Sequence, residues 1–135
     1  MQKKVIYLSY DGMTDPLGQS QVIPYMKGLA TAGYSITILS AEKMSPLISG
    51  SSVRKQLGAF GILWVPVAFS STIAGWSTLL NFLRLKRKAY SLSNEKKFDI
   101  IHCRSYIPAL IGFSLRRRFG SKIILHREEE SLARR

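Results

Sequence analysis

The chain has 135 residues, the size of one ordinary domain, and its apolar fraction of 46% is sufficient for a hydrophobic core. Its net charge is +12, of which residues 51–135 carry +11. This basic half favours an acidic partner, which can be phosphate groups, an anionic membrane surface or nucleic acid; the alternative is a solvated surface that is simply basic. The single cysteine, Cys103, excludes an intrachain disulfide and suits a reducing compartment, so we expect a cytoplasmic protein.

The first forty residues are arranged as strand, loop, helix and strand. A β-branched run over residues 3–9 leads into a turn-rich loop over residues 10–18. A helix-like segment follows over residues 19–32, and a second apolar run begins at residue 34. Because Pro24 lies in the first turns of that helix, we expect it to begin irregularly. The pattern predicts one βαβ unit.

The rest of the chain continues the alternation of helices and strands. The pattern predicts a short helix over residues 51–60, a strand over 62–67, a long helix over 72–94, a strand over 98–103, a helix over 106–119 that is capped by Gly120, and a strand over 122–125. This alternation indicates an α/β fold: a single, Rossmann-like domain with a doubly wound parallel sheet of strand order 3-2-1-4-5. We expect the domain to span residues 1–126 and a charged tail to follow over 127–135.

The uncharged segment between Lys55 and Arg84 is 28 residues long, which is enough to span a bilayer. Pro66 would break a continuous helix there, and Ser70-Ser71-Thr72 is typical of a loop that ends in a helix N-cap. We therefore expect a strand and a separate helix in this segment.

The long helix over residues 72–94 carries two apolar lines at helical spacing. We expect the first line to face the core: Ile73, Trp76, Leu79, Leu80 and Leu83. The second line lies beside a basic cluster, residues 84–88, and fits either docking on an anionic membrane surface or burial against another domain: Phe82, Leu85, Ala89 and Leu92. In the helix over residues 106–119, we expect a buried side that includes Ile107, Leu110, Ile111, Ser114 and Leu115.

The predicted strand order places two distant loops at one crevice, because the loops after the first and fourth strands flank the switch point of the sheet. The first of these loops contains neither a dinucleotide fingerprint nor a P-loop. Gly18 permits a tight turn and a close backbone approach, and the N–H groups of Gln19 and Ser20 are candidates to face a phosphate. The alternative is a capped helix without a ligand. Asp11 and Asp15 either orient sugar hydroxyls or simply form the turn.

The second loop follows the fourth strand and has the sequence His102-Cys103-Arg104-Ser105-Tyr106. His102 is either an acid, base or hydroxyl-positioning donor, or a histidine at the edge of the core. Arg104 can pair with a phosphate or a carboxylate, and Ser105 is a candidate N-cap of the next helix. We expect Cys103 to be a small buried residue and not a nucleophile. The sequence contains no Cys/His cluster typical of zinc and no paired carboxylates typical of a hydrolase.

Two segments carry a resemblance to a known family. Residues 5–21, followed by Lys27-Gly28-Leu29 and residues 33–37, resemble the start of a family 4 glycosyltransferase of the GT-B fold. Residues 98–106 are similar to the fourth strand of that family and the loop after it. The resemblance covers most of residues 3–125. The family is mostly retaining, so the resemblance implies a retaining enzyme that needs no metal or other cofactor. It also implies an acceptor-binding N-terminal domain and a C-terminal domain that binds the nucleotide-sugar donor.

The resemblance also implies roles for individual residues. The turn-rich loop over residues 10–18, called the glycine loop below, is expected with Gly18 and Gln19 near the donor phosphates. The acceptor side is expected to include Asp11, Arg104, Ser105 and Tyr106, and His102 is the candidate catalytic residue.

The chain departs from the family plan because it stops at Arg135, before a donor domain. We therefore expect the acceptor-binding half of a glycosyltransferase for a glycan or glycolipid, inactive alone, with the second domain supplied in cis or in trans. A peripheral position on the inner face of the membrane is compatible with this role. One alternative is a non-catalytic nucleotide-binding or regulatory Rossmann module. A nucleic-acid binder is disfavoured, because few aromatic residues interleave with the Arg and Lys runs.

Overall fold

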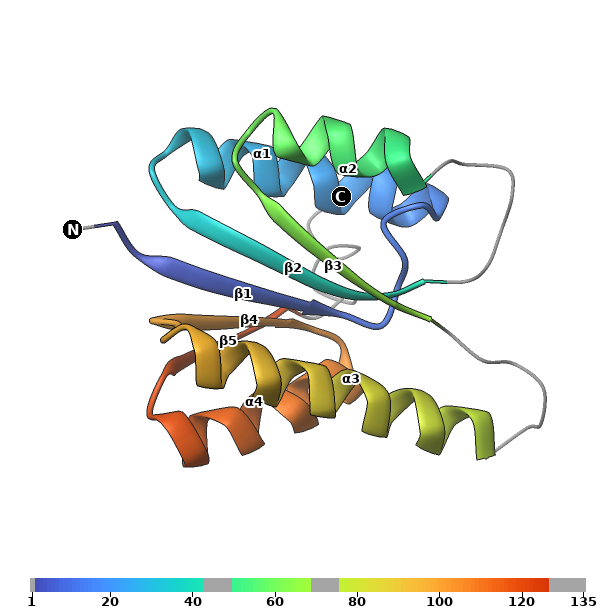
Figure 1. Cartoon of the computed structure of the whole chain (residues 1–135), viewed down its shortest axis with the longest axis vertical. Helices are drawn as coiled ribbons and strands as arrows, with labels where there is room; N and C mark the ends of the chain where they lie inside the picture. The colour runs from blue at the N-terminus through green and yellow to red at the C-terminus, as the bar shows by residue number, and fades with distance from the viewer. Residues whose placement is uncertain (1, 43–49, 69–75, 127–135) are drawn as a thin grey trace.

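The computed structural model describes residues 2–42, 50–68 and 76–126 (Figure 1). The order of elements along the chain is β1 (Lys4–Ser9), the π-helical turn η1 (Gly18–Val22), α1 (Ile23–Thr31), β2 (Ser35–Glu42), α2 (Gly50–Gly58), β3 (Leu63–Ala68), α3 (Trp76–Glu95), β4 (Ile100–Arg104), α4 (Tyr106–Phe119) and β5 (Lys122–His126). The expected loop and N-cap at Ser70-Ser71-Thr72, the expected core position of Ile73 and the tail over residues 127–135 lie outside the described residues, as does the side chain of Trp76.

The five strands form one parallel sheet in the order β3-β2-β1-β4-β5, which confirms the predicted architecture. β1 lies at the centre, with Ser9 beside Ser40 of β2 on one side and beside Arg104 of β4 on the other. The chain therefore leaves β1 and β4 next to each other at the carboxyl edge of the sheet. This is the switch point at which α/β proteins place their ligands.

Helices cover both faces of the sheet, with α1 and α2 on one face and α3 and α4 on the other (Figure 1). Alternate residues of the strands point to opposite faces, so the core is divided into two clusters. Val5 and Tyr7 belong to the cluster under α1 and α2, whereas Ile6, Leu8 and Cys103 belong to the cluster under α3 and α4. The sheet is thus doubly wound, as predicted.

The irregular helix start is also confirmed. The chain enters the first helix through η1, and Pro24 then occupies the first turn of α1. A proline has no N–H to donate to the carbonyl of the preceding turn. The wider π turn before Pro24 is the local consequence, and it sets the position of the residues just after the glycine loop.

The face of α3 that packs on the sheet differs from the prediction. Leu79, Leu80 and Leu83 are 48%, 43% and 48% exposed, whereas Leu85 and Ala89 are fully buried. The second apolar line is therefore the core face, and the expected core stripe was wrong for its three described leucines. Both lines have helical spacing, so periodicity alone could not choose between them. The line that packs in the core is the one on the side of α3 that faces the sheet, where Leu85 and Ala89 join the cluster under α3 and α4.

α4 begins and ends at the predicted residues, and Gly120 caps it in a left-handed conformation (φ 78°) with its N–H donated to the Arg116 carbonyl. Its buried side was predicted less well, because Leu110 is 60% exposed. Gly112 lies on the buried side instead, where a Cβ atom would come within 2.4 Å of the Cys103 Sγ. The missing side chain lets α4 approach β4 closely.

The segment between Lys55 and Arg84 contains β3 and the start of α3, so the expectation of a strand and a separate helix is confirmed for its described part. Within residues 2–42, 50–68 and 76–126, none of the helices has both the length and the apolar character that crossing a bilayer requires.

The close contact at Gly112 can be tested by substitution. We expect Gly112→Ala to lower the free energy of unfolding by about 1–3 kcal/mol, because the added methyl group overpacks the contact with Cys103. Gly28→Ala is the matched control, since Gly28 lies within α1 and a Cβ there would meet nothing within 4 Å. The control is expected to raise the free energy of unfolding by about 0.5–1 kcal/mol. Urea unfolding of both variants measures the difference, and equal stabilities would contradict the packing described here.

Candidate functional site

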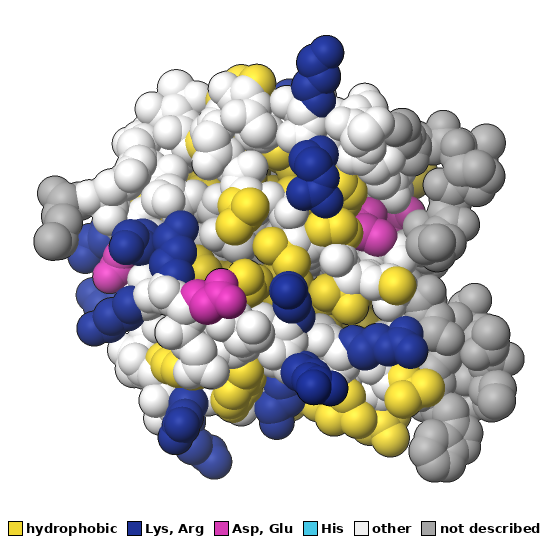
Figure 2. Space-filling view, viewed as in Figure 1, with side chains coloured by type: hydrophobic (Ala, Val, Ile, Leu, Met, Phe, Trp, Pro, Cys, Tyr) yellow, Lys and Arg dark blue, Asp and Glu magenta, His cyan; other side chains and the backbone are white. Residues whose placement is uncertain are grey.

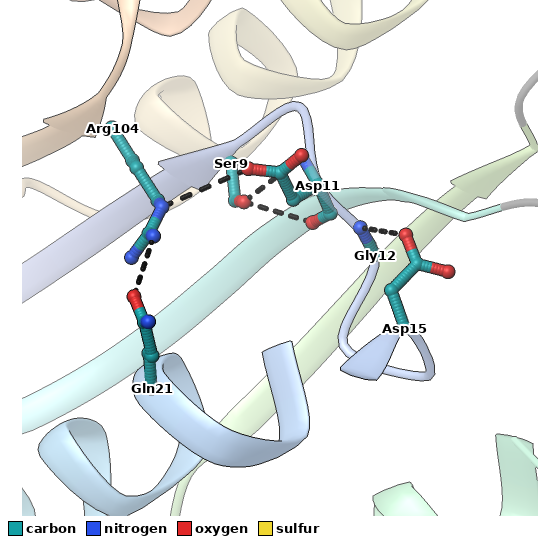
Figure 3. A network of polar contacts seen from close by, with 6 residues as sticks. All are labelled: Ser9, Asp11, Gly12, Asp15, Gln21 and Arg104. Carbon is teal, nitrogen blue, oxygen red and sulfur yellow. Dashed lines mark hydrogen bonds and ion pairs between the residues drawn. The ribbon is translucent and has the colours of Figure 1, made fainter. Parts of the chain in front are cut away.

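A buried guanidinium joins the two loops at the switch point. Arg104, at the end of β4, is only 4% exposed. Its Nη2 donates a hydrogen bond to Oε1 of Gln21 in η1 (3.0 Å), and its Nε lies 3.7 Å from Oδ2 of Asp11 in the loop after β1 (Figure 3). The loops after β1 and β4 therefore meet, as predicted, whereas a ligand-binding crevice between them stays a prediction. Gln21 was not predicted as part of the site.

The Asp11 carboxylate is the solvent-exposed member of this ion pair. The side chain of Asp11 is 39% exposed, against 5% for that of Arg104. The backbone of Asp11 is held by Ser9, whose Oγ donates to the Asp11 carbonyl (2.8 Å) and accepts from its N–H (3.1 Å). A charge as buried as that of Arg104 needs a charged or polar partner to offset its lost hydration. The arrangement fixes the position of a carboxylate that remains accessible from solvent.

The glycine loop is closed by its own backbone. The Asp15 N–H donates to the Gly12 carbonyl (3.1 Å), and the Asp15 carboxylate accepts from the Gly12 N–H (3.1 Å) (Figure 3). A Cβ on Gly18 would lie 2.3 Å from the Gly12 carbonyl oxygen. The predicted close approach at Gly18 is thus present, but the group that approaches is the loop and not a ligand. Asp15 has the turn-forming role that was one of its two readings.

Gln19 is engaged within the same loop. Its backbone N–H donates to the Asp15 carbonyl (3.0 Å), and its side-chain Nε2 donates to the Met13 carbonyl (2.8 Å). The backbone N–H of Gln19 is therefore not a free donor for a phosphate, contrary to the expectation for this group. A donor-phosphate site at Gly18 and Gln19 stays a prediction.

Glu42 holds the middle of the glycine loop in place, and the sequence analysis did not identify it as part of the site. It lies at the end of β2, is 8% exposed, and accepts hydrogen bonds from the N–H groups of Met13 (2.7 Å) and Thr14 (3.2 Å) and from the Thr14 hydroxyl (3.0 Å). The Ser40 hydroxyl donates to the same carboxylate, and the Trp64 indole N–H donates to Ser40 (2.9 Å). An acidic residue at the carboxyl end of an apolar strand was the signal that could have identified it.

His102 lies two residues before Arg104 on the same face of β4, between two tyrosines. It is 6% exposed, and its ring centroid lies 4.9 Å from that of Tyr7 and 5.9 Å from that of Tyr25. Burial raises the pKa of Tyr7 to about 12, against the opposing effect of its hydrogen bond with Arg104, so Tyr7 is a neutral phenol at pH 7. The burial of His102 between these two tyrosine rings favours its interpretation as a histidine at the edge of the core. Its catalytic role stays a prediction.

Cys103 lies on the opposite face of β4, fully buried under α4. Burial raises the pKa of its thiol to about 12, so the reactive thiolate is disfavoured. The prediction of a small buried residue is confirmed.

The two residues after Arg104 turn the chain into α4. Ser105 occupies the N-cap position, as predicted, but its hydroxyl makes no capping hydrogen bond. Its φ of 67° and ψ of −173° lie in a region that costs a non-glycine residue about 1–3 kcal/mol. Tyr106 is the first residue of α4 and is 81% exposed. The strained turn therefore presents an aromatic ring to solvent directly beyond Arg104, and acceptor roles for Ser105 and Tyr106 stay predictions.

Metal-ligating side chains do not gather in the part of the chain that the structure describes: no three of its His, Cys, Asp or Glu residues are grouped so that they could hold an ion.

Comparison with known proteins extends this description of the fold. No family model and no curated protein matches the chain. Among solved structures, the C-terminal domain of the PF1911 hydrogenase from Pyrococcus furiosus superimposes with a TM-score of 0.68 at 18% identity, covering 93% of this chain and 94% of that domain. The calicheamicin glycosyltransferase CalG4 gives a TM-score of 0.63 at 14% identity, and MurG from Acinetobacter baumannii gives 0.58 at 15% identity.

These similarities show a fold shared with glycosyltransferase domains and with the hydrogenase domain. Each of the two glycosyltransferases aligns with 93% of this chain, but the chain spans only 32% of CalG4 and 35% of MurG. The common part is thus about a third of the length of each of these two glycosyltransferases.

The support that Glu42 provides can be measured. We expect Glu42→Gln to lower the free energy of unfolding by about 1.5–3 kcal/mol, because an amide NH₂ replaces one of the acceptor oxygens that face Met13, Thr14 and Ser40. Hydrogen exchange at the Met13 and Thr14 amides should also accelerate. Glu95→Gln, at the exposed end of α3, is the matched control and should leave both quantities unchanged. Equal behaviour of the two variants would contradict this role of Glu42.

Proposed function

We propose that this chain is the acceptor-binding part of a retaining glycosyltransferase that uses a nucleotide-sugar donor and a glycan or lipid-linked acceptor. The observation that carries the proposal is the ion pair between buried Arg104 and partly exposed Asp11 at the switch point of the sheet. The Arg104 Nε lies 3.7 Å from the Asp11 Oδ2. The likeness of the fold to CalG4 and MurG supports it.

The pair is suited to holding a sugar. Sugar hydroxyls donate hydrogen bonds, and the Asp11 carboxylate is an acceptor whose position Arg104 and Ser9 determine. Tyr106 adds an exposed aromatic face at the start of α4, on which the apolar side of a sugar ring can pack. A few placed polar groups beside an aromatic surface are typical of small-molecule sites.

Transfer requires a donor held against this acceptor. Donor and acceptor must lie in near-attack geometry for the reaction to proceed. We propose that a second domain, in cis or in trans, grips the donor phosphates beside the glycine loop at Gly18 and Gln19. On this proposal the chain alone does not transfer a sugar and requires no metal.

A non-catalytic nucleotide-binding module is the second candidate. It is retained because the same fold occurs in the PF1911 hydrogenase domain, which belongs to a protein that is not named as a glycosyltransferase. In such a module the Asp11 carboxylate would accept hydrogen bonds from ribose hydroxyls.

The proposal is tested by titrating the isotopically labelled chain with p-nitrophenyl glucoside, an acceptor mimic, and separately with UDP. We expect the glucoside to shift the amide signals of residues 11–15, 17–18 and 104–106, because the site holds a sugar without the second domain. Asp11→Asn should weaken this binding at least about tenfold, the cost of one charge-assisted hydrogen bond. Asp99→Asn is the matched control, because Asp99 lies at the opposite edge of the sheet, where its carboxylate accepts from the Lys4 N–H.

The outcomes separate the two candidates. Tight binding of UDP in the crevice, without binding of the glucoside, would replace the proposal with the nucleotide-binding module. Glucosyl transfer from UDP-glucose by the purified chain would contradict the need for a second domain.

A further inference from the structure

The outward face of α3 carries three leucines that the core does not use. Leu79, Leu80 and Leu83 are each between 43% and 48% exposed. Helical spacing places Arg84 and Arg87 on the same side, since they lie four residues beyond Leu80 and Leu83, respectively. We call these five residues the docking face. Figure 2 shows hydrophobic side chains beside Lys and Arg side chains over the first half of α3, at the lower right of the view.

The charges along α3 are of one sign over most of its length. Residues 76–88 contain four cations and no acid, and the only acidic residue of the helix, Glu95, is its last. A surface that accepts this pattern must supply negative charge beside an apolar layer. Acidic phospholipids supply both, because their phosphates lie directly above the acyl chains.

We propose that the docking face of α3 lies on an anionic phospholipid membrane. Leu79, Leu80 and Leu83 enter the boundary between headgroups and acyl chains, while Arg84 and Arg87 pair with lipid phosphates. The helix lies in the plane of the membrane. This is the side of α3 opposite to the apolar line for which membrane docking was one of two predicted alternatives; that line packs in the core of this domain.

Docking on this face brings the crevice near the membrane. Asn81, on the buried side of the same turns, lies with its Nδ2 3.4 Å from the hydroxyl of Tyr10, the residue before Asp11. The start of α3 is therefore in contact with the loop that carries the candidate site. The docking itself does not depend on the proposed glycosyl transfer and can be tested without it.

The test is co-sedimentation of the full chain with phosphatidylcholine vesicles, with and without phosphatidylglycerol. We expect binding only to the vesicles that contain phosphatidylglycerol. Each Lys or Arg near an anionic leaflet strengthens binding by about fivefold, so Arg84→Glu with Arg87→Glu should weaken it by about 25-fold or more. Leu80→Ser with Leu83→Ser should also weaken it, because apolar insertion is lost. Circular dichroism verifies that each variant is folded.

The matched control is Lys55→Glu with Lys97→Glu. It changes the net charge equally, at two exposed positions outside the docking face, one in α2 and one between α3 and β4. It should retain most of the binding. Equal loss in the control and in the arginine variant would overturn the proposal, since it would mean that any part of the basic surface binds. No binding to either vesicle would also overturn it. Self-association without lipid that the leucine substitutions abolish would assign the face to a second copy of the chain instead.

Discussion

The contact on which the site depends is that of one buried guanidinium with two segments distant in sequence. Arg104 reaches Asp11 in the loop after β1 and Gln21 in η1, although 83 residues separate it from Gln21. A guanidinium in the protein interior is costly without partners, so the fold places them there. This requirement fixes the loop, the helix entrance and the orientation of the Asp11 carboxylate together.

Glu42 acts from the other side of the same loop as a second buried polar anchor. Arg104 holds the beginning of the loop, and Glu42 holds Met13 and Thr14 in its middle. Between these anchors, Gly12 and Gly18 pack backbone against backbone. The loop is thus built into the end of the sheet. Such rigid positioning is what a binding site requires of the loops around it.

The sequence predicted the strand order and the meeting of the two loops, because alternating strands and helices leave few right-handed arrangements of a parallel sheet. It did not predict Glu42 or Gln21, since their partners are backbone and side-chain groups whose positions depend on the folded loop. It also misassigned Leu79, Leu80 and Leu83, because α3 has apolar lines on both sides and only packing on the sheet selects one. The close approach at Gly18 was predictable from the glycine, whereas the group that approaches it was not.

Arg104 and Asp11 interact directly and together hold the site. A double-mutant cycle of Arg104→Met and Asp11→Asn, read out as the free energy of unfolding, measures this interaction. We expect a coupling energy of about 0.5–3 kcal/mol between the two substitutions, because each removes one partner of the same pair. Additive effects, within about 0.3–0.5 kcal/mol, would mean that the two side chains do not interact.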